Sequence, residues 1–388
     1  MIVRQFLQWL RNAPPGERAD ATSALARAYL HSELSPDDRA AAEGAMIMLL
    51  DDPSPLVRQA LSEVFASSQA APAVVVHALA ADQPDVARPL LQRSPLLGEA
   101  DLVDLAATTH AESQAAIASR FLLPRAVSAA IAEVGAAQAC LALLENPDAD
   151  IAAFSLDRIV ERFGHLSAIR ENLLARNDLP ATTRQAALAK LSQTLAGFVA
   201  SRHWMPSEHA QYSAREACEK ATIALAAETP YEEIGVLVSH LRSSGQLTAN
   251  LVLRALLSGN VVLFEEALAD LSGVPVENVA SLVHDRMLSG FRALYGKAAL
   301  PVTAYPAFRE AVMALREGAL PAHGHAALLS RPMVERVLMR CTEEGGDIEP
   351  LLSLLRRFAV EAARDEARSF CHDLVAEPQM PTVPRLAA

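Results

Sequence analysis

A short phrase returns with variations along the first half of this chain, and each copy indicates a turn that starts a helix. The clearest copy covers residues 52–61, and further copies follow at 82–88, 146–152 and 177–188. A period of about 30 to 40 residues, each holding one helical pair, is typical of a stacked α-solenoid. Such pairs cannot bury their apolar faces alone, so neighbouring pairs must stack. The sequence therefore predicts an all-α fold built as an α-solenoid of helical hairpins, which usually acts by offering a surface.

The composition supports helices and a reducing compartment. Hydrophobic residues make up 51% of the chain but aromatics only 5%, so the core must consist mainly of Ala, Leu and Val. Ala and Leu favour helices. The four cysteines are far apart and form no C-x-x-C pair, which does not suit a disulfide framework. No stretch approaches the roughly 18 apolar residues that span a bilayer. We expect a cytoplasmic protein.

The charge limits the possible partners. Forty-six acidic residues against 34 basic ones give a net charge of −12. Nucleic-acid binding depends on neutralising phosphates, so an acidic chain disfavours it. Adsorption to an anionic membrane is disfavoured for the same reason. We expect a protein partner, no nucleic acid and no membrane span, and the sequence leaves the oligomeric state open.

Changes in the expected helix length and in the composition of the turns predict four regions along the chain. Residues 1–200 are expected to form the solenoid, and 201–320 a helical region with longer helices. Residues 321–376 are expected to form terminal helices. The proline-containing segment 377–388 cannot continue a helix and is expected to be a mobile tail.

The charged residues of the repeated phrase have a structural use. An Asp in the turn can cap the next helix, while an Arg can bind carbonyls or the Asp of a neighbouring repeat. This predicts a ladder of contacts inside the solenoid, made by Asp52, Arg58, Asp82, Arg88 and Arg184.

Two groups of basic residues are candidates for anion sites. If a small anionic ligand, such as a nucleotide messenger, binds in a cleft between the two regions, then Arg202, Arg242 and Arg254 are the candidate ligands. Residues 356–368 form a concentrated basic stretch, which is diluted by acidic residues at spacings suited to pairs within one helix. We interpret that stretch as a solvated helix with internal salt bridges.

Catalytic signatures are missing from the sequence, so we expect no catalytic, cofactor-binding or metal-binding residues. There is no G-x-S-x-G elbow, no P-loop and no G-x-G-x-x-G motif. His203, His209 and His323 invite a metal search, but no neighbouring ligands complete a tetrahedral set. Residues 264–283 have the spacing of a helix-turn-helix, yet the second helix would present acidic groups to DNA, which favours a plain helical hairpin.

Two parts of the chain resemble known families. The Asp-Pro-x-x-x-Val-Arg phrases and helical pairs of residues 52–200 resemble HEAT repeats. Residues 245–260, together with Leu263-Phe264 and residues 267–269, are similar to a bacterial family known as domain of unknown function 2336. The second resemblance runs through roughly 245–300 and is expected to extend over most of the chain. It implies a HEAT-like helical bacterial protein and brings no established active residues.

The leading functional hypothesis is a non-catalytic scaffold or regulatory adaptor that holds a partner protein on its concave face. A sensor for a small anionic ligand and a metal-dependent enzyme with a noncontiguous site remain as alternatives.

Overall fold

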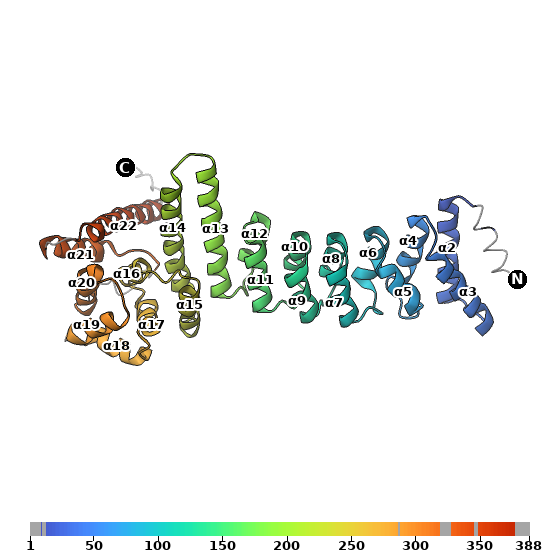
Figure 1. Ribbon diagram of the computed structural model, residues 1–388, viewed down its shortest axis with the longest axis horizontal. Helices are drawn as coiled ribbons and strands as arrows, with labels where there is room; N and C mark the ends of the chain where they lie inside the picture. The colour runs from blue at the N-terminus through green and yellow to red at the C-terminus, as the bar shows by residue number, and fades with distance from the viewer. Residues whose placement is uncertain (1–8, 10–12, 286–287, 319–326, 345–347, 377–388) are drawn as a thin grey trace, which may run out of the picture. The chain divides into compact units, whose positions relative to one another are not determined.

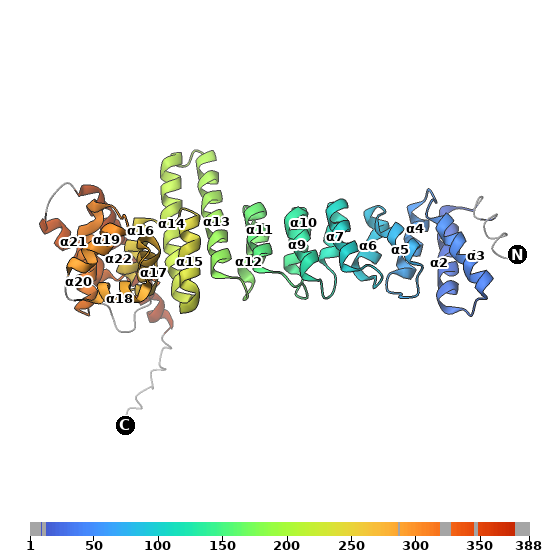
Figure 2. The same cartoon turned by 60° about the horizontal axis from the view of Figure 1, so that its bottom comes forward.

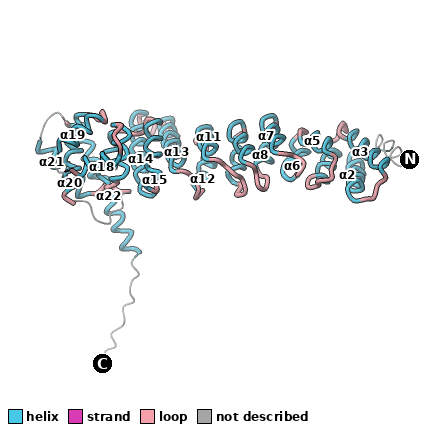
Figure 3. The backbone as a smooth tube through the Cα atoms, turned by 90° about the horizontal axis from the view of Figure 1, so that it is seen from below, coloured by secondary structure: helices cyan, strands magenta, loops and turns pink. Residues whose placement is uncertain are grey.

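The structure is a computed structural model that describes residues 9, 13–285, 288–318, 327–344 and 348–376. Throughout these residues the regular structure is helical and no strand occurs (Figure 3), which confirms the all-α prediction. The expected tail, residues 377–388, lies outside the described residues. The chain divides into two compact units between Leu191 and Ser192.

The helices of the first unit form two rows that alternate along the chain (Figures 1 and 2). Successive members of one row pack against each other: α2 (Pro15–His31), α4 (Pro55–Phe65), α6 (Pro84–Arg93), α8 (Ala111–Ala118), α10 (Ala137–Glu145) and α12 (Ser167–Ala175). The intervening helices are α3 (Pro36–Leu49), α5 (Ala73–Ala80), α7 (Glu99–Thr108), α9 (Arg125–Val134) and α11 (Ala153–Phe163). This arrangement is that of stacked helical hairpins.

Proline and small polar residues set where several of these helices begin. Helices α3, α4 and α6 each carry proline in the first turn, where the missing N–H costs no hydrogen bond. Ahead of α3, the Ser35 hydroxyl accepts the Asp38 N–H at 3.2 Å and caps the helix. The turn chemistry of the repeated phrase therefore provides start signals for helices.

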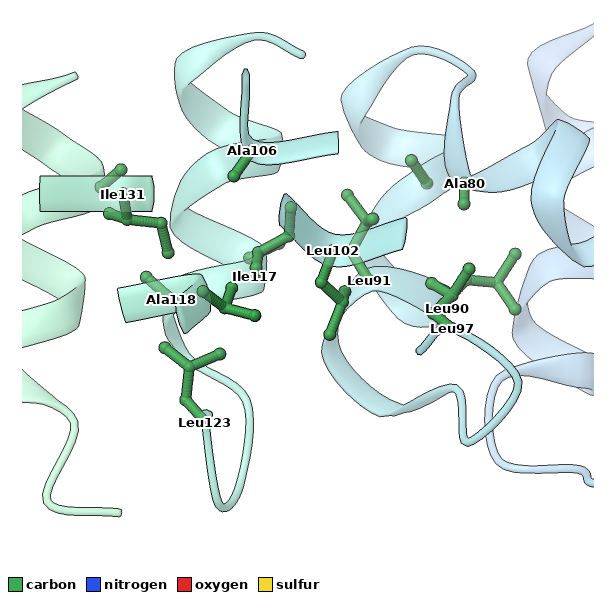
Figure 4. Packing of buried hydrophobic residues seen from close by; sticks show 14 of the residues in the cluster. Ala80, Leu90, Leu91, Leu97, Leu102, Ala106, Ile117, Ala118, Leu123 and Ile131 are labelled. Atoms are coloured by element: carbon green, nitrogen blue, oxygen red, sulfur yellow. The ribbon is translucent and has the colours of Figure 1, made fainter. Parts of the chain in front are cut away.

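The core of the first unit is one continuous cluster of buried, mainly aliphatic side chains. Leu90 and Leu91 of α6 and Ile117 of α8 are fully buried between the rows (Figure 4). Leu123 and Ile131 continue the cluster into the next repeat. Each hairpin thus covers the apolar side of its neighbour.

Charged contacts between repeats run beside this core. Arg58 of α4 forms an ion pair with Asp82 at the start of the next repeat and also donates to the carbonyl of Asp52 at 2.7 Å. The carboxylate of Asp52 in turn forms an ion pair with Arg18, in which Nη2 lies 2.8 Å from Oδ1. Arg184 donates to the carbonyl of Arg176 at 3.1 Å. These contacts link successive turns of the solenoid.

Arg88 departs from the predicted ladder. Its side chain is exposed on α6, and within the described part of the chain it makes no ion pair. Asp82, the acid of the same phrase, is already bound by Arg58 from the preceding repeat. Arg120 instead bridges this region, donating to the carbonyls of Leu91 and Ser94 at 2.7 and 2.8 Å.

The second unit is a cluster of helices around α16. Its helices are α14 (Ser207–Glu228), α15 (Tyr231–Ser243), α16 (Ala249–Ser258), α17 (Val261–Ser272), α18 (Val276–His284), α19 (Leu288–Lys297), α20 (Tyr305–Arg316), α21 (Arg331–Glu344) and α22 (Glu349–Ala376), with a 3-10 turn at Val302–Ala304. All residues of α16 from Leu251 to Ser258 are buried. A helix that is apolar on every side belongs in a core, and α14, α17 and α20 all pack against it.

Helix α13 (Ala181–Ser201) crosses the division between the two units. The polar turn that follows this helix predicts a boundary between residues 200 and 201, nine residues after the division. Residues 181–201 contain no proline and run as one unbroken helix. Within the second unit, α21 packs against both α20 and α22.

Candidate functional site

The three arginines proposed as anion ligands lie at different places in the second unit and have different partners. Arg202 follows α13 and stacks over the Phe198 ring at 5.4 Å. Arg242, near the end of α15, donates to the carbonyl of Asp270 at 2.6 Å. Arg254 is buried in α16 and pairs with Glu361. The structure does not bring these three side chains together into one site.

Arg254 is the most unusual of them, because it is a charged residue in an apolar helix. Only 2% of the residue is exposed. Its Nη1 donates to Glu361 Oε1 of α22 at 2.7 Å, and its guanidinium lies 4.5 Å from the centre of the Phe358 ring. Its Nε and Nη2 have no hydrogen-bond partner among the described residues. A buried charge requires such a pairing, so Arg254 ties α16 to α22.

Glu219 and Glu361 are perturbed in opposite directions near this arginine. Burial of Glu219 raises its pKa, although Thr248 donates to its Oε1 at 2.7 Å. Burial also acts to raise the pKa of Glu361, but hydrogen bonds from Arg254 and Lys220 outweigh it and lower the pKa. Glu361 is therefore held as a carboxylate.

A groove lies between α14 and α22, on the side where Glu361 reaches the surface. Its cavity volume is about 630 Å³. Lys220 of α14 bridges the groove to α22, at 3.3 Å from Glu361 and 2.5 Å from Asp365. Basic side chains of α22 also line it: Arg356, Arg357, Arg364 and Arg368.

The acidic residues of α22 play the role that the sequence predicts only in part: within the helix, Asp365 lies 3.6 Å from Arg368 and Glu349 lies 2.6 Å from Arg356. Glu361 pairs with residues of α14 and α16, Asp365 pairs with Lys220, and Glu366 pairs with Arg331 of α21. The interpretation of this helix as one held mainly by internal salt bridges is thus incomplete. Its acids join neighbouring helices, and several of its arginines are left facing the groove.

A second candidate site is an aromatic patch at the end of α13 and in the turn that follows. Figure 1 shows this turn, which connects α13 to α14. The rings of Phe198 and Trp204 meet edge to face, with centroids 5.8 Å apart. Trp204 is 72% exposed and Phe198 47% exposed, and Leu195 on the same helix is also exposed. We call Leu195, Phe198, Arg202 and Trp204 the tip patch.

Two of the histidines considered as metal ligands lie near the tip patch. His203 is in the turn with a φ of 56°, and His209 is exposed on the first turn of α14. The described residues contain no group of three His, Cys, Asp or Glu side chains placed to hold a metal ion. His323 lies outside the described residues.

Sequence reasoning missed both the groove and the tip patch. The groove joins helices that are far apart in sequence, as the contact between Lys220 and Asp365, 145 residues apart, shows. One signal was present: Arg357, Arg364 and Arg368 follow each other at intervals of seven and four residues, which places them on one face of a helix. The sequence signal for the tip patch is the segment from Phe198 to Trp204. It is rich in aromatic and basic side chains, whereas the chain as a whole contains few aromatics.

Among the described residues, no helix combines the length and the apolar character that crossing a bilayer requires. A search of curated proteins and a search of solved structures found no match to this chain. A family model described as "Uncharacterised protein conserved in bacteria (DUF2336)" matches residues 86–344, which is more than half of the chain. This match confirms the resemblance noted in residues 245–300. The chain therefore belongs to this bacterial family, DUF2336.

Proposed function

We propose that this protein is a non-catalytic binding scaffold or regulatory adaptor that holds a partner protein through the tip patch. The observation that carries the proposal is the exposed Phe198–Trp204 pair with Arg202 stacked on it. Tryptophan and arginine are enriched among the few residues that dominate binding energy at protein interfaces. Aromatic rings also supply large contact areas when they become buried.

The chemistry of the patch favours a partner with an apolar pocket. Trp204 is one of only two tryptophans in the chain, and most of its surface faces solvent. Other exposed aromatic side chains, such as Phe121 and Phe154, make no ring contact within the described residues. The tip patch differs because its rings fix each other, which reduces the entropy lost on binding. We also propose a cytoplasmic location, because the four cysteines are free thiols, as is usual in a reducing compartment.

The test compares three full-length chains, the wild type, Trp204→Ala and Tyr231→Ala, as baits in the native bacterium. Tyr231 is a matched control, since it is 60% exposed and lies in the same unit. We expect one set of partner proteins to be retained by the wild type and by Tyr231→Ala but lost by Trp204→Ala.

The affinity for a purified partner provides the quantitative check. Truncating a dominant interface residue costs about 2 kcal/mol or more, so Trp204→Ala should weaken Kd about thirtyfold or more. Circular dichroism should show an unchanged melting curve, because the removed side chain is exposed. Equal binding by Trp204→Ala and the wild type would show that the tip patch is not the docking surface.

A further inference from the structure

The groove between α14 and α22 has the size of a small-molecule site. It lies within the second unit, and its volume of about 630 Å³ is in the range of ligand pockets, which hold about 300 to 1,000 Å³. Ser213, Glu216, Ala217 and Lys220 supply its α14 side, at the three- and four-residue spacing of one helical face. Residues from Ser353 to Arg368 supply the α22 side.

The charge of the groove is opposite to that of the chain. Five basic side chains and three acidic ones line it, whereas the whole chain carries −12. Two of the three acids, Glu361 and Asp365, already pair with Lys220. The buried Arg254 adds a further positive charge behind Glu361. The remaining positive charge therefore belongs to the arginines that line the open groove.

Two of these arginines have no carboxylate partner among the described residues. Arg364 is exposed and makes no ion pair there. Arg357 is held in place by the Tyr212 ring, which lies 4.6 Å from its guanidinium carbon. Arg368 pairs only weakly, at 3.6 Å from Asp365, with its side chain 78% exposed. A planar guanidinium matches phosphate oxygens with two parallel hydrogen bonds.

The spacing of the arginines fits more than one phosphate. A helix rises about 1.5 Å per residue, so Arg364 and Arg368 start about 6 Å apart along α22, and Arg357 starts about 10 Å before Arg364. Val360 lies between them, lines the groove and is half exposed. The groove thus offers a cationic end at Arg364 and Arg368 and a less polar stretch beside Val360.

We propose that the α14–α22 groove binds a small ligand carrying at least two linked phosphate groups, held by Arg357, Arg364 and Arg368. Linked phosphates of this kind occur in nucleoside di- and triphosphates and in inorganic polyphosphate. The less polar stretch favours the nucleotide. This inference goes beyond the proposed function, because the groove and the tip patch share no residue.

Isothermal titration calorimetry of the full chain tests the proposal, with pyrophosphate, tripolyphosphate, ADP, ATP and GTP as probes at low salt. We expect saturable binding of one or more probes, which weakens as salt is added because the contacts are screened. Tighter binding of a nucleotide than of tripolyphosphate would identify a nucleotide ligand. Equal binding would identify the phosphate chain alone. Failure of every probe to bind at concentrations up to about 1 mM would overturn the proposal.

Variants connect the binding to the groove. Arg364→Ala removes an exposed side chain that makes no hydrogen bond or ion pair among the described residues, so the fold should be unaffected, and Kd should rise about tenfold or more. Arg357→Ala should act in the same direction. Arg340→Ala is the matched control, because Arg340 is similarly exposed on α21 and, among the residues that the structure describes, forms its ion pair with Glu343 alone. Unchanged binding by Arg364→Ala and Arg357→Ala, or an equal loss by Arg340→Ala, would overturn the assignment. Trp204→Ala should leave this binding intact.

Discussion

At the scale of single residues, Asp52 shows how one side chain joins two repeats. Its carboxylate accepts two hydrogen bonds from Arg18, at 2.8 and 3.0 Å, and a third from the Ser54 N–H at 2.8 Å. Burial alone would raise the pKa of Asp52, but these hydrogen bonds outweigh it and hold the pKa below its ordinary value. The folded state therefore favours the charged form.

This linkage predicts a pH-dependent effect of Asp52→Asn. The folded pKa lies below the unfolded value of about 3.9, so the stabilisation is present above that value and is lost as pH falls through the folded pKa. At pH 7 the variant should lose roughly 1.5 to 3 kcal/mol of unfolding free energy, the range for a hydrogen bond to a charged group. The difference should shrink towards pH 3. Urea unfolding at both pH values measures it.

Asp178→Asn is the control for this prediction. Asp178 also pairs with an arginine, but its side chain is 63% exposed. Exposed ion pairs contribute about 0 to 1 kcal/mol, so this variant should lose less at pH 7. A loss as large as that of Asp52→Asn, or a difference that grows on acidification, would contradict the role of Asp52.

The ladder could be predicted in part from residue types alone. An Asp in a turn and an Arg one helical turn later have few other uses in a repeat, and Arg58 and Asp82 do form a pair. Arg88 follows its Asp at the same distance in sequence, but it is the fifth residue of α6 whereas Arg58 is the fourth residue of α4. The shift of one residue turns its side chain by about 100° around the helix, and it is exposed. Arg162 was not predicted, since it binds the carbonyls of Ala132 and Gly135, which carry no sequence signature.

At the scale of elements, the connection between α8 and α9 is held in a strained shape. Asn146 donates to the carbonyls of Ala118 and Arg120, both at 2.7 Å, and so fixes the start of the connection. Leu122 has a φ of 50°, in the left-handed region that residues with a Cβ atom disfavour. Its side chain is exposed and gains little from burial. The neighbouring hydrogen bonds and the buried Leu123 impose this conformation.

Leu122→Gly should therefore be tolerated or stabilising. Glycine removes about 1 to 2 kcal/mol of left-handed strain but loses about 0.5 to 1 kcal/mol through greater freedom of the unfolded chain. The expected change is a gain of roughly 0 to 1.5 kcal/mol in the free energy of unfolding, measured in urea. Leu123→Gly, one residue later and fully buried, should instead lose more than about 2 kcal/mol. Similar losses for both variants would show that Leu122 supports the fold through its side chain.

Elements were more predictable than their packing partners. Proline and Ser signals mark the starts of α3, α4 and α6 because these signals act within a few residues. The groove between α14 and α22 depends on a contact between residues 145 apart, which no local pattern specifies. The basic face of α22 was visible, but whether its acids bind within the helix or across to α14 and α16 is decided only by tertiary packing.

At the scale of the whole molecule, the residues that the structure describes form two hydrophobic cores. One consists of buried residues from Ala26 to Ala187, and the other of residues from Ile223 to Ala362, and they share no member. The family match, residues 86–344, begins inside the first and ends inside the second. In stacked repeats each hairpin contacts only its neighbours, so a local defect should remain local.

Leu90→Ala tests this picture of local coupling. Leu90 of α6 is fully buried, and α6 packs against α4 and α8 in its row. Removing the side chain leaves a cavity, which should lower the free energy of unfolding of the surrounding helices by about 2 to 5 kcal/mol. Hydrogen exchange measured by mass spectrometry should then show faster exchange in α4, α6 and α8, while peptides from α16 keep their protection because they belong to the other core. Leu256→Ala, in α16, should give the reverse pattern. If either substitution increased exchange equally in both cores, the two would unfold as a single cooperative unit, and the repeats could not act as nearest-neighbour modules.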